Sequence, residues 1–395
     1  MMYINDSSRV WHVAKTGNDS NSGHAGQYPV NLANDAKLTI GAAISVAANG
    51  DTIIIWPGVY AENVNLGGKA LTLTGTHRNQ CLINPATGVG LIIGSGCKVE
   101  NLSVEATELG TNACALGVAY QSQGVTIRNM RITGAYDGIY CPNCSDIFVE
   151  NCHVIGLDDA INLQNTFGVI ARNCVFETTG QYSTAVEAHC VFYAESAIFD
   201  NCIMKAARSD SSTAGLMCFL MNSTSALVVC NNCIFQTIAG SNSTGDLASI
   251  KIGNGKLVLK ECVFQTSKAG AQNSEYGPFD IWNVSGSVIV NGCSYTTTSG
   301  TIIQSDSKWA GALATALYIN GEANKLKIDS AGKVEAAGVA GVDTELLTKA
   351  VKLLTNKAVQ DKLSGAIQYF DNDEETVILT HTPSEDGSSL TRAVS

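Results

Sequence analysis

The feature that most constrains the fold of this chain is an internal repeat whose period is much longer than one secondary-structure element. Short stretches of alternating apolar residues end in Asn, and the chain resumes with Cys or another apolar residue. Copies of this step lie at Asn101-Leu102, Asn129-Met130, Asn151-Cys152, Asn173-Cys174, Asn201-Cys202 and Asn232-Cys233, with degraded copies at Glu261-Cys262 and Gly292-Cys293. Successive copies are 28, 22, 22, 28, 31, 29 and 31 residues apart, the length of one three-stranded coil with variable loops. The repeat therefore predicts stacked coils.

Each copy also contains the strands that such a coil needs. Gly168 to Arg172, Cys174 to Thr178 and Ala185 to His189 are strand-like pieces separated by Gly, Asn, Ser or Thr. Only 15% of the residues are charged and 38 are Gly, which disfavours long helices. We therefore predict an all-β fold, a right-handed single-stranded parallel β-helix of about ten coils.

The Asn and Cys of the repeat predict two structural rows along the solenoid. A short amide tolerates the left-handed backbone of a tight corner and can hydrogen-bond to the Asn of the next coil. Side chains alternate along a strand, so the Cys after each corner is predicted to face inward. Neighbouring thiols about 4.8 Å apart pack well but are poorly aimed for disulfides, so we interpret them as reduced core residues. The predicted rows are Asn129, Asn151, Asn173, Asn201 and Asn232, and Cys152, Cys174, Cys202, Cys233, Cys262 and Cys293.

The residue directly after each Cys should then face outward. On four consecutive coils this position holds an apolar residue: Val175, Ile203, Ile234 and Val263. An apolar stripe on a solvent face is typical of an interface, so we expect self-association, as a homotrimer. Cover by loops or the tail of the same chain is the alternative.

The two ends of the solenoid need caps, because open strand edges invite further pairing. Residues 1–37 are interpreted as an N-terminal arm, and the apolar spacing over 38–48 predicts a capping helix that ends at Asn49-Gly50. The β-helix with its cap spans 38–308, followed by a hairpin and linker over 309–341. Residues 342–395 are predicted to form a small α+β domain, a helix capped by Asp343 plus a hairpin, that docks or oligomerises.

The N-terminal half resembles a known superfamily. Gly17-Asn18-Asp19-Ser20-Asn21-Ser22-Gly23, the helix ending in Asn-Gly-Asp, and Ile55-Trp56-Pro57-Gly58-Val59-Tyr60 with Glu62 look like the start of pectin-lyase-like β-helices. This resemblance implies the fold and leaves the activity open, because the superfamily holds lyases, hydrolases, esterases, epimerases, phage tailspikes and adhesins.

The C-terminal segment is similar to structural proteins of tailed phages, of the tail or decoration type. The similarity rests on Leu354 to Lys362, Thr380-His381-Thr382-Pro383 and Leu390-Thr391-Arg392. Together with the interface stripe it favours a virion structural protein that binds a receptor or surface glycan and contacts other virion proteins. A polysaccharide lyase or glycoside hydrolase of the same fold is the alternative, and a cell-surface adhesin is the third hypothesis.

The candidate catalytic residues are Asp158 and Asp159 in Gly156-Leu157-Asp158-Asp159-Ala160-Ile161. This motif looks like the paired Asp of polygalacturonases, in which two carboxylates would flank a glycosidic bond. The Gly-His-Gly and Arg-Ile-Lys elements of that family are absent, and Asp137 in Tyr136-Asp137-Gly138-Ile139 occupies the equivalent corner one coil earlier. The pattern thus favours turn residues and a non-enzymatic protein.

Other acidic residues and possible cofactors add little to this picture. Glu187, Asp210, Asp246 and Asp280, with His189, could line a groove, but a solvated role suits each of them. Calcium could bind Asp19 with Asn18 and Asn21, although a capped turn is the expected use. We expect no cofactor and no metal centre, because Cys141-Pro142-Asn143-Cys144 has no second pair at zinc spacing.

Charge and hydropathy exclude two classes of partner. Lys plus Arg total 24 against 35 Asp plus Glu, a net charge of −11 without a long basic run, so no nucleic acid partner is expected. Neither 18 consecutive apolar residues nor a signal-peptide pattern over Met1 to Val10 occurs, so we expect no membrane partner. The expected location is the virion, after synthesis in the host cytoplasm.

Overall fold

The structure, a computed structural model, describes residues 7–24, 30–107, 114–179, 188–208, 215–240, 247–268, 279–283, 287–291 and 293–295. Beyond these it describes only the short strands β29 to β36. The chain divides into two compact units, Met1–Lys333 and Val334–Ser395.

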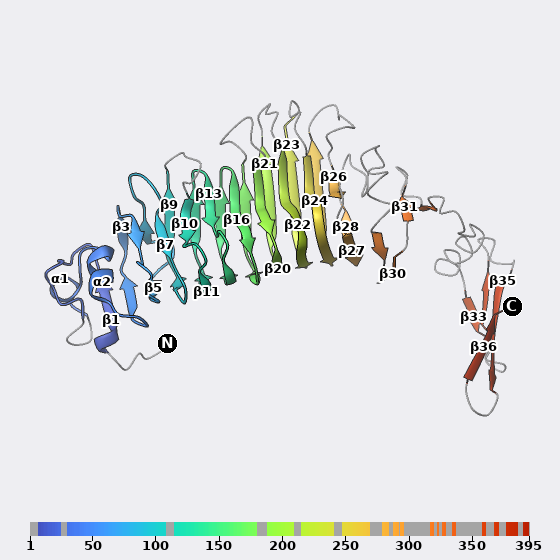
Figure 1. Cartoon of the computed structure of the whole chain (residues 1–395), viewed down its shortest axis with the longest axis horizontal. Helices are drawn as coiled ribbons and strands as arrows, with labels where there is room; N and C mark the ends of the chain where they lie inside the picture. The colour runs from blue at the N-terminus through green and yellow to red at the C-terminus, as the bar shows by residue number, and fades with distance from the viewer. Residues whose placement is uncertain are drawn as a thin grey trace. The chain divides into compact units, whose positions relative to one another are not determined.

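The first unit is a stack of coils in which strands of successive coils pair in parallel, so that three faces run along the stack (Figure 1). Face I contains β4 (Val64–Asn65), β7 (Leu91–Ile93), β10 (Cys114–Val118), β13 (Asp137–Tyr140), β16 (Asp159–Thr166), β19 (Ala188–Ala194) and β26 (Phe279–Asn283). Face II contains β1 (Val10–Val13), β2 (Thr52–Ile55), β5 (Thr72–Gly75), β8 (Lys98–Glu100), β11 (Gln123–Arg128), β14 (Ser145–Glu150), β17 (Val169–Arg172), β20 (Ser196–Asp200), β27 (Ser287–Asn291) and β29 (Leu317–Ile319). Face III contains β3 (Gly58–Tyr60), β6 (Cys81–Ile83), β9 (Ser103–Ala106), β12 (Arg131–Gly134), β15 (His153–Gly156), β18 (Val175–Thr178), β21 (Ile203–Arg208), β23 (Ile234–Ala239), β25 (Val263–Lys268) and β28 (Ser294–Tyr295).

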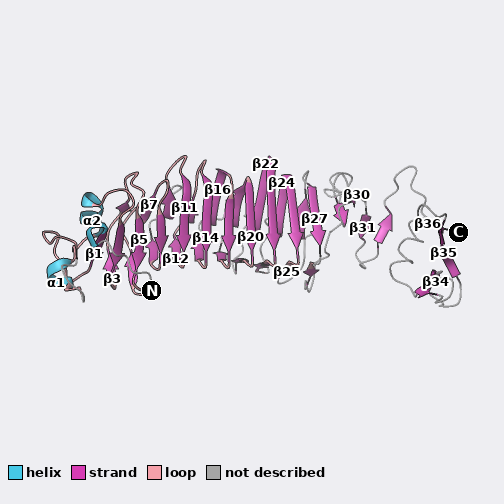
Figure 2. Ribbon diagram, turned by 90° about the horizontal axis from the view of Figure 1, so that it is seen from below, coloured by secondary structure: helices cyan, strands magenta, loops and turns pink. Residues whose placement is uncertain are grey.

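The chain visits the faces in the order I, II, III in every coil, as β13, β14 and β15 illustrate. Two long strands, β22 (Leu216–Asn231) and β24 (Leu247–Lys260), continue from face I into face II and join them in one 20-stranded sheet. Face III is a separate 10-stranded sheet, which agrees with the predicted number of coils. The all-β parallel solenoid predicted from the repeat is confirmed (Figure 2).

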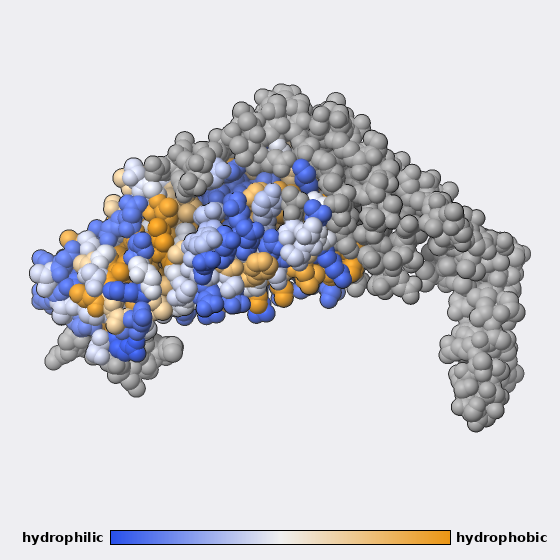
Figure 3. Space-filling view, viewed as in Figure 1, coloured by the Kyte–Doolittle hydropathy of each residue, from blue (hydrophilic) through white to orange (hydrophobic). Residues whose placement is uncertain are grey.

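The core of the solenoid is a continuous column of buried apolar side chains between the three faces. Its largest members include Phe176, Phe199 and Phe219, whose rings pack edge to face in adjacent coils. The outer surface is mixed, with hydrophobic residues gathered in small patches among hydrophilic ones on the side shown in Figure 3.

The Asn of the repeat lies at the corner between faces II and III. Asn101, Asn129, Asn151, Asn173, Asn201 and Asn232 all have φ between 48° and 59°. Asn129 Nδ2 donates a hydrogen bond to Asn101 Oδ1, and Asn201 Nδ2 donates one to Asn173 Oδ1; the donor–acceptor distance is 2.7 Å in both. The corner therefore uses Asn for its left-handed backbone and links some neighbouring coils through the side-chain amides.

From Asn151-Cys152 onward, a Cys follows each of these corners, and Leu102 and Met130 take its place in the two earlier coils. Cys152, Cys174, Cys202, Cys233 and Cys262 are buried, Cys293 is half-buried, and all are free thiols. Their Sγ atoms contact backbone carbonyls, for example Cys174 Sγ with Arg172 O at 3.1 Å. Such contacts suit reduced thiols that serve as small core residues.

A short helical cap closes the N-terminal end. Helix α2 (Ile40–Val46) begins after Thr39, whose Oγ1 accepts a hydrogen bond from Ala42 N, and Glu62 accepts from Ile40 N and Gly41 N. The helix is shorter than the predicted 38–48, because Ala47 is already extended and Asn49-Gly50 forms the following turn. Ahead of it lie η1 (Ser7–Arg9), β1 and α1 (Leu32–Asp35).

Part of the stretch interpreted as an arm thus belongs to the solenoid. β1 pairs in parallel with β2, from Val10 opposite Thr52 to Val13 opposite Ile55. The side chain of Asp51 ties the two together, accepting from Trp11 Nε1 at 2.9 Å and Arg9 Nε at 3.1 Å.

At the C-terminal side, β29 pairs in parallel with β27 and antiparallel with β30 (Glu322–Ala323), so sheet pairing continues past Trp309, where the repeat pattern stops. Within the stretch 309–341, where the sequence predicts a hairpin and linker, the antiparallel partner of β29 is β30 rather than β31 (Leu326–Ile328).

In the second unit, β33 (Ala358–Gln360), β34 (Ile367–Phe370), β35 (Val377–Glu385) and β36 (Leu390–Val394) form a four-stranded antiparallel sheet; β32 (Val334–Ala336) precedes them. β34 and β35 pair where the sequence pattern places a hairpin. The helix predicted after Asp343 lies outside the described residues, except for Ala358, which begins β33. Over the part of the chain that is described, no helix has the length and apolar character to cross a membrane.

Candidate active site

The corner between faces III and I carries the candidate carboxylates. Two successive coils turn there through equivalent four-residue segments, one from Gly134 to Asp137 and the other from Gly156 to Asp159. A side chain at either glycine would collide with a backbone carbonyl, since an added Cβ would lie 1.8 Å from Asp137 O or 1.9 Å from Asp159 O. These glycines therefore permit a tight turn that delivers one aspartate to the start of each face I strand.

Strand pairing stacks these aspartates in one column. Ile139 lies opposite Ile161, which brings Asp137 level with Asp159, and Asp159 lies opposite His189 in the next coil. Cys114 precedes Asp137 in the same column. Neighbouring members of such a column are separated by one strand spacing, about 4.8 Å.

The column faces outward because alternation breaks at the corner. Ala160 and Ile161 are consecutive residues, and both are fully buried in the core. Asp159 therefore falls on the same side as the outward residue Asn162, whose Nδ2 donates to Asp159 Oδ2 at 3.2 Å and to Asp137 Oδ2 at 3.4 Å. A regular strand would have pointed Asp159 into the apolar interior.

Three carboxylates meet at this place. One ligand oxygen from each of Asp137, Asp158 and Asp159 lies within 4.8 Å of the others, and each residue is only 4% exposed. His189 Nδ1 lies 2.9 Å from Asp159 Oδ1, and Tyr136 hydrogen-bonds to the Asp158 carboxyl. We call Asp137, Asp158 and Asp159 the acidic cluster.

Burial and mutual repulsion raise the pKa values of the acidic cluster. Burial is the largest cause for each residue, and the neighbouring carboxylates add to it for Asp137 and Asp158. The pKa of Asp137 is held well above its ordinary range, and that of Asp158 is raised to about 6. His189 opposes the rise in the pKa of Asp159, and the positive charge of Arg208 opposes that of Asp158. At neutral pH the cluster can therefore both hold and release protons.

We expect Asp158→Asn to stabilise the protein at pH 7. The folded pKa of Asp158 is about 6 and an unfolded Asp titrates near about 4, so folding binds a proton in this interval and the wild type gains stability as pH falls from 7 to 5. The amide has no charge to desolvate, so the variant should exceed the wild type by about 1–2 kcal/mol at pH 7 and by less at pH 5. Urea unfolding at both pH values measures this, and an equal difference at the two would contradict the burial argument.

The acidic cluster also has the chemistry to hold a divalent cation. Carboxylate and amide oxygens are ligands that calcium prefers. Asp137 Oδ1 and Asn162 Oδ1 are buried and accept no hydrogen bond from the described residues. Asp19 is built differently, because its carboxylate accepts from Leu38 N, Thr39 N and Thr39 Oγ1 and so fastens the start of α2.

The motif Asp158-Asp159 thus marks a three-carboxylate site. Sequence reasoning treated Asp137 as a sign of a mere turn, whereas the turn is also what brings it to Asp158 and Asp159. His189 supplies a histidine beside the cluster without the Gly-His-Gly motif. The signal that could have found both is the shared register of the coils. Glu187, Asp210, Asp246 and the side chain of Asp280 lie outside what the structure describes.

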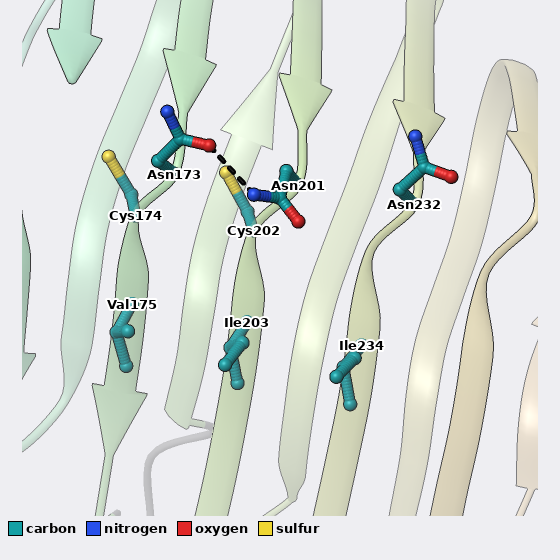
Figure 4. Close-up of a pocket in the computed structure, with 8 residues that line it drawn as sticks. All are labelled: Asn173, Cys174, Val175, Asn201, Cys202, Ile203, Asn232 and Ile234. Atoms are coloured by element: carbon teal, nitrogen blue, oxygen red, sulfur yellow. Dashed lines mark hydrogen bonds between the residues drawn. The ribbon is translucent and has the colours of Figure 1, made fainter. Parts of the chain in front are cut away.

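The predicted apolar stripe lies on the outer side of face III. Val175, Ile203, Ile234 and Val263 stand opposite one another in β18, β21, β23 and β25. Figure 4 shows Val175, Ile203 and Ile234 side by side, next to the corner asparagines and their hydrogen bond between Asn173 and Asn201. They line an open groove of about 270 Å³ together with Asn173, Cys174, Asn201, Cys202 and Asn232.

Comparison with known proteins identifies the fold. The family model described as "Right handed beta helix region" matches residues 72–218. The chain folds as a right-handed parallel β-helix. No curated protein matches it.

Similar solved structures include pectate lyase Pel9A and two pectin methylesterases. Pel9A is 12% identical, with 91% of this chain and 93% of that chain covered and a TM-score of 0.48. The carrot pectin methylesterase is 13% identical, with 78% and 87% covered and a TM-score of 0.47. The rice weevil pectin methylesterase is 16% identical, with 71% and 90% covered and a TM-score of 0.40.

Proposed function

We propose that this β-helix cleaves glycosidic bonds and that the acidic cluster is its catalytic centre. The observation that carries this proposal is the meeting of Asp137, Asp158 and Asp159 within 4.8 Å on the outer side of face I. Buried like charges are costly, and groups with perturbed pKa values gather at catalytic sites. Glycoside hydrolysis uses such carboxyl groups, one protonated and one ionised.

The environments of the three residues suggest their roles. Asp158, with a pKa near 6 and a hydrogen bond to Tyr136, is suited to give its proton to the leaving glycosidic oxygen. Asp159, oriented by His189, is suited to attack the anomeric carbon, because carboxyl groups this close fit the retaining rather than the inverting geometry. A carboxylate oxygen of Asp159 bonds to that carbon as the glycosidic C–O bond breaks. Water, giving its proton to Asp158, then displaces the carboxylate and releases the sugar. Burial and the neighbouring Asp159 keep the pKa of Asp158 raised. Asp137 completes the acidic cluster, and burial and the other two carboxylates raise its own pKa.

The experiment that tests this proposal is the release of reducing ends from a panel of neutral and acidic polysaccharides. Wild-type protein and Asp158→Asn are compared on each polymer. Cleavage that depends on Asp158 supports the proposal, and cleavage of no polymer, or equal cleavage by both proteins, contradicts it.

A second candidate function is a structural component of a tailed-phage virion that binds a receptor or surface glycan. The exposed stripe on face III favours it, because Ile203 is 38% exposed in a row of aliphatic residues across four coils. The C-terminal resemblance to phage tail or decoration proteins points the same way. In this role the chain is a homotrimer that contacts other virion proteins and is located in the virion. Glycan cleavage and a virion location are compatible.

The stripe makes a specific prediction about assembly. If the stripe forms the trimer interface, the mass by light scattering should be near three times 41.4 kDa, and Ile203→Asp should reduce it to the monomer. Lys205→Asp, one outward position further along β21, is the control, because Lys205 pairs with Glu177 beside the stripe. A wild-type monomer at every concentration would contradict the trimer.

A further inference from the structure

The acidic cluster and the neighbouring Asn162 each contain a buried oxygen that receives no hydrogen bond from the described residues. Asp137 Oδ1 and Asn162 Oδ1 are each buried in residues at most 6% exposed, and neither receives a hydrogen bond within the described part of the chain. A buried acceptor without a donor costs about 1–3 kcal/mol. The side chain of Asn162 is fixed in place, because its Nδ2 already bridges Asp137 and Asp159. The natural complement of these oxygens is a ligand that brings hydrogen-bond donors.

Aromatic rings stand on both sides of Asn162 along the solenoid axis. Tyr140 lies opposite Asn162 in one neighbouring coil and Phe192 lies opposite it in the other, so the rings are roughly 10 Å apart along the axis. Both are half-buried on the outer side of face I. Phe192 also packs on His189, with 4.9 Å between ring centroids, and stacks on Tyr193 at 3.9 Å.

The charge of the site opposes an anionic ligand. The acidic cluster places three carboxyl groups in one spot, balanced by His189 and Arg208, and the whole chain carries a net charge of −11. A uronate keeps ring hydroxyl groups but adds a carboxylate, which the acidic cluster repels and which cannot donate a hydrogen bond to Asp137 or Asn162. A neutral sugar offers hydroxyl donors and an apolar ring face for Tyr140 and Phe192.

From these contacts we infer that the site takes a neutral, hydroxyl-rich glycan, laid along the solenoid axis over Tyr140, Asn162 and Phe192, rather than a polyuronate. This inference rests on the proposed function and adds the substrate class. Hydroxyl groups of the sugar donate to Asp137 Oδ1 and Asn162 Oδ1, and the rings of Tyr140 and Phe192 contact sugar faces on either side of the acidic cluster.

The test measures the binding of oligosaccharides to the full-length Asp158→Asn variant, which should cleave them too slowly to disturb the measurement. The array holds neutral and uronate-containing oligosaccharides in equal numbers. We expect binding to neutral members. Phe192→Ala and Tyr140→Ala, added singly, should each weaken it by roughly tenfold. Tyr120→Ala is the matched control, because Tyr120 is an exposed aromatic residue outside this row. Circular dichroism verifies that each variant is folded.

Three results would overturn the inference: binding confined to uronate-containing glycans, binding to no glycan, or binding that requires added calcium, which would mean that the free oxygens hold a cation. The proposed function is judged separately, by cleavage. If the wild type binds a neutral glycan but does not cleave it, the catalytic role is contradicted and the substrate class is not. If it cleaves only polyuronates, the substrate class is contradicted and the catalytic role is not.

Discussion

We expect Asp158→Asn to lower the rate of glycan cleavage by about 10²–10⁴-fold, the usual contribution of a general acid. The reason is that Asn cannot give a proton to the leaving oxygen, while it preserves the size of the side chain and an acceptor for Tyr136. Reducing-end release from a cleaved polysaccharide measures the loss. Asp146→Asn is the matched control, since it makes the same chemical change at an exposed aspartate in β14, and it should cleave like the wild type.

The pH profile provides an independent check on the same residue. Because Asp158 must be protonated to act as the acid and its pKa is about 6, cleavage should fall as the pH rises above 6. A rate that is unchanged between pH 5 and pH 8 would assign the proton to another group. Taken with the gain in stability expected at pH 7, Asp158→Asn should be more stable and far less active than the wild type, which is the usual trade-off at a site built from repelling charges.

Phe199→Ala should lower the free energy of unfolding by about 3–5 kcal/mol. The ring of Phe199 is fully buried and packs edge to face on Phe176 at 6.1 Å and on Phe219 at 5.6 Å, so its removal leaves a cavity shared by three coils. In a solenoid each coil is stabilised mainly by its two neighbours, so a cavity there weakens the stack on both sides.

Urea unfolding followed by circular dichroism measures this loss. Phe167→Ala is the control, because Phe167 is 48% exposed and its removal should change stability by less than about 1 kcal/mol. Equal effects of the two substitutions would show that the aromatic contacts inside the coils do not stabilise the stack.

The fold was largely predictable because it is local. The corner asparagines recur in six successive coils, four of them followed by Cys. The left-handed geometry at Asn173 or Asn201 follows from what a tight corner demands. The end of α2 was less predictable. Ala47 leaves the helix before the Asn49-Gly50 signal, while Asp51, which accepts hydrogen bonds from Trp11 and Arg9, ties the turn to β1. Such a contact, made between residues 40 positions apart, leaves no trace in a local pattern.

The sequence by itself determined the coil, its length and the row of outward aliphatic residues, because each coil needs only its own alternation and its neighbours. Only the tertiary structure decided the site. Asp137 and Asp159 are 22 residues apart whereas Asp159 and His189 are 30 apart, and strand pairing nevertheless places all three in one column. Loops between strands change length without changing register, and the break in alternation at Ala160-Ile161 turns the acids outward. The chemistry therefore depends on which strands pair, a property of the folded chain that spacing along the sequence does not contain.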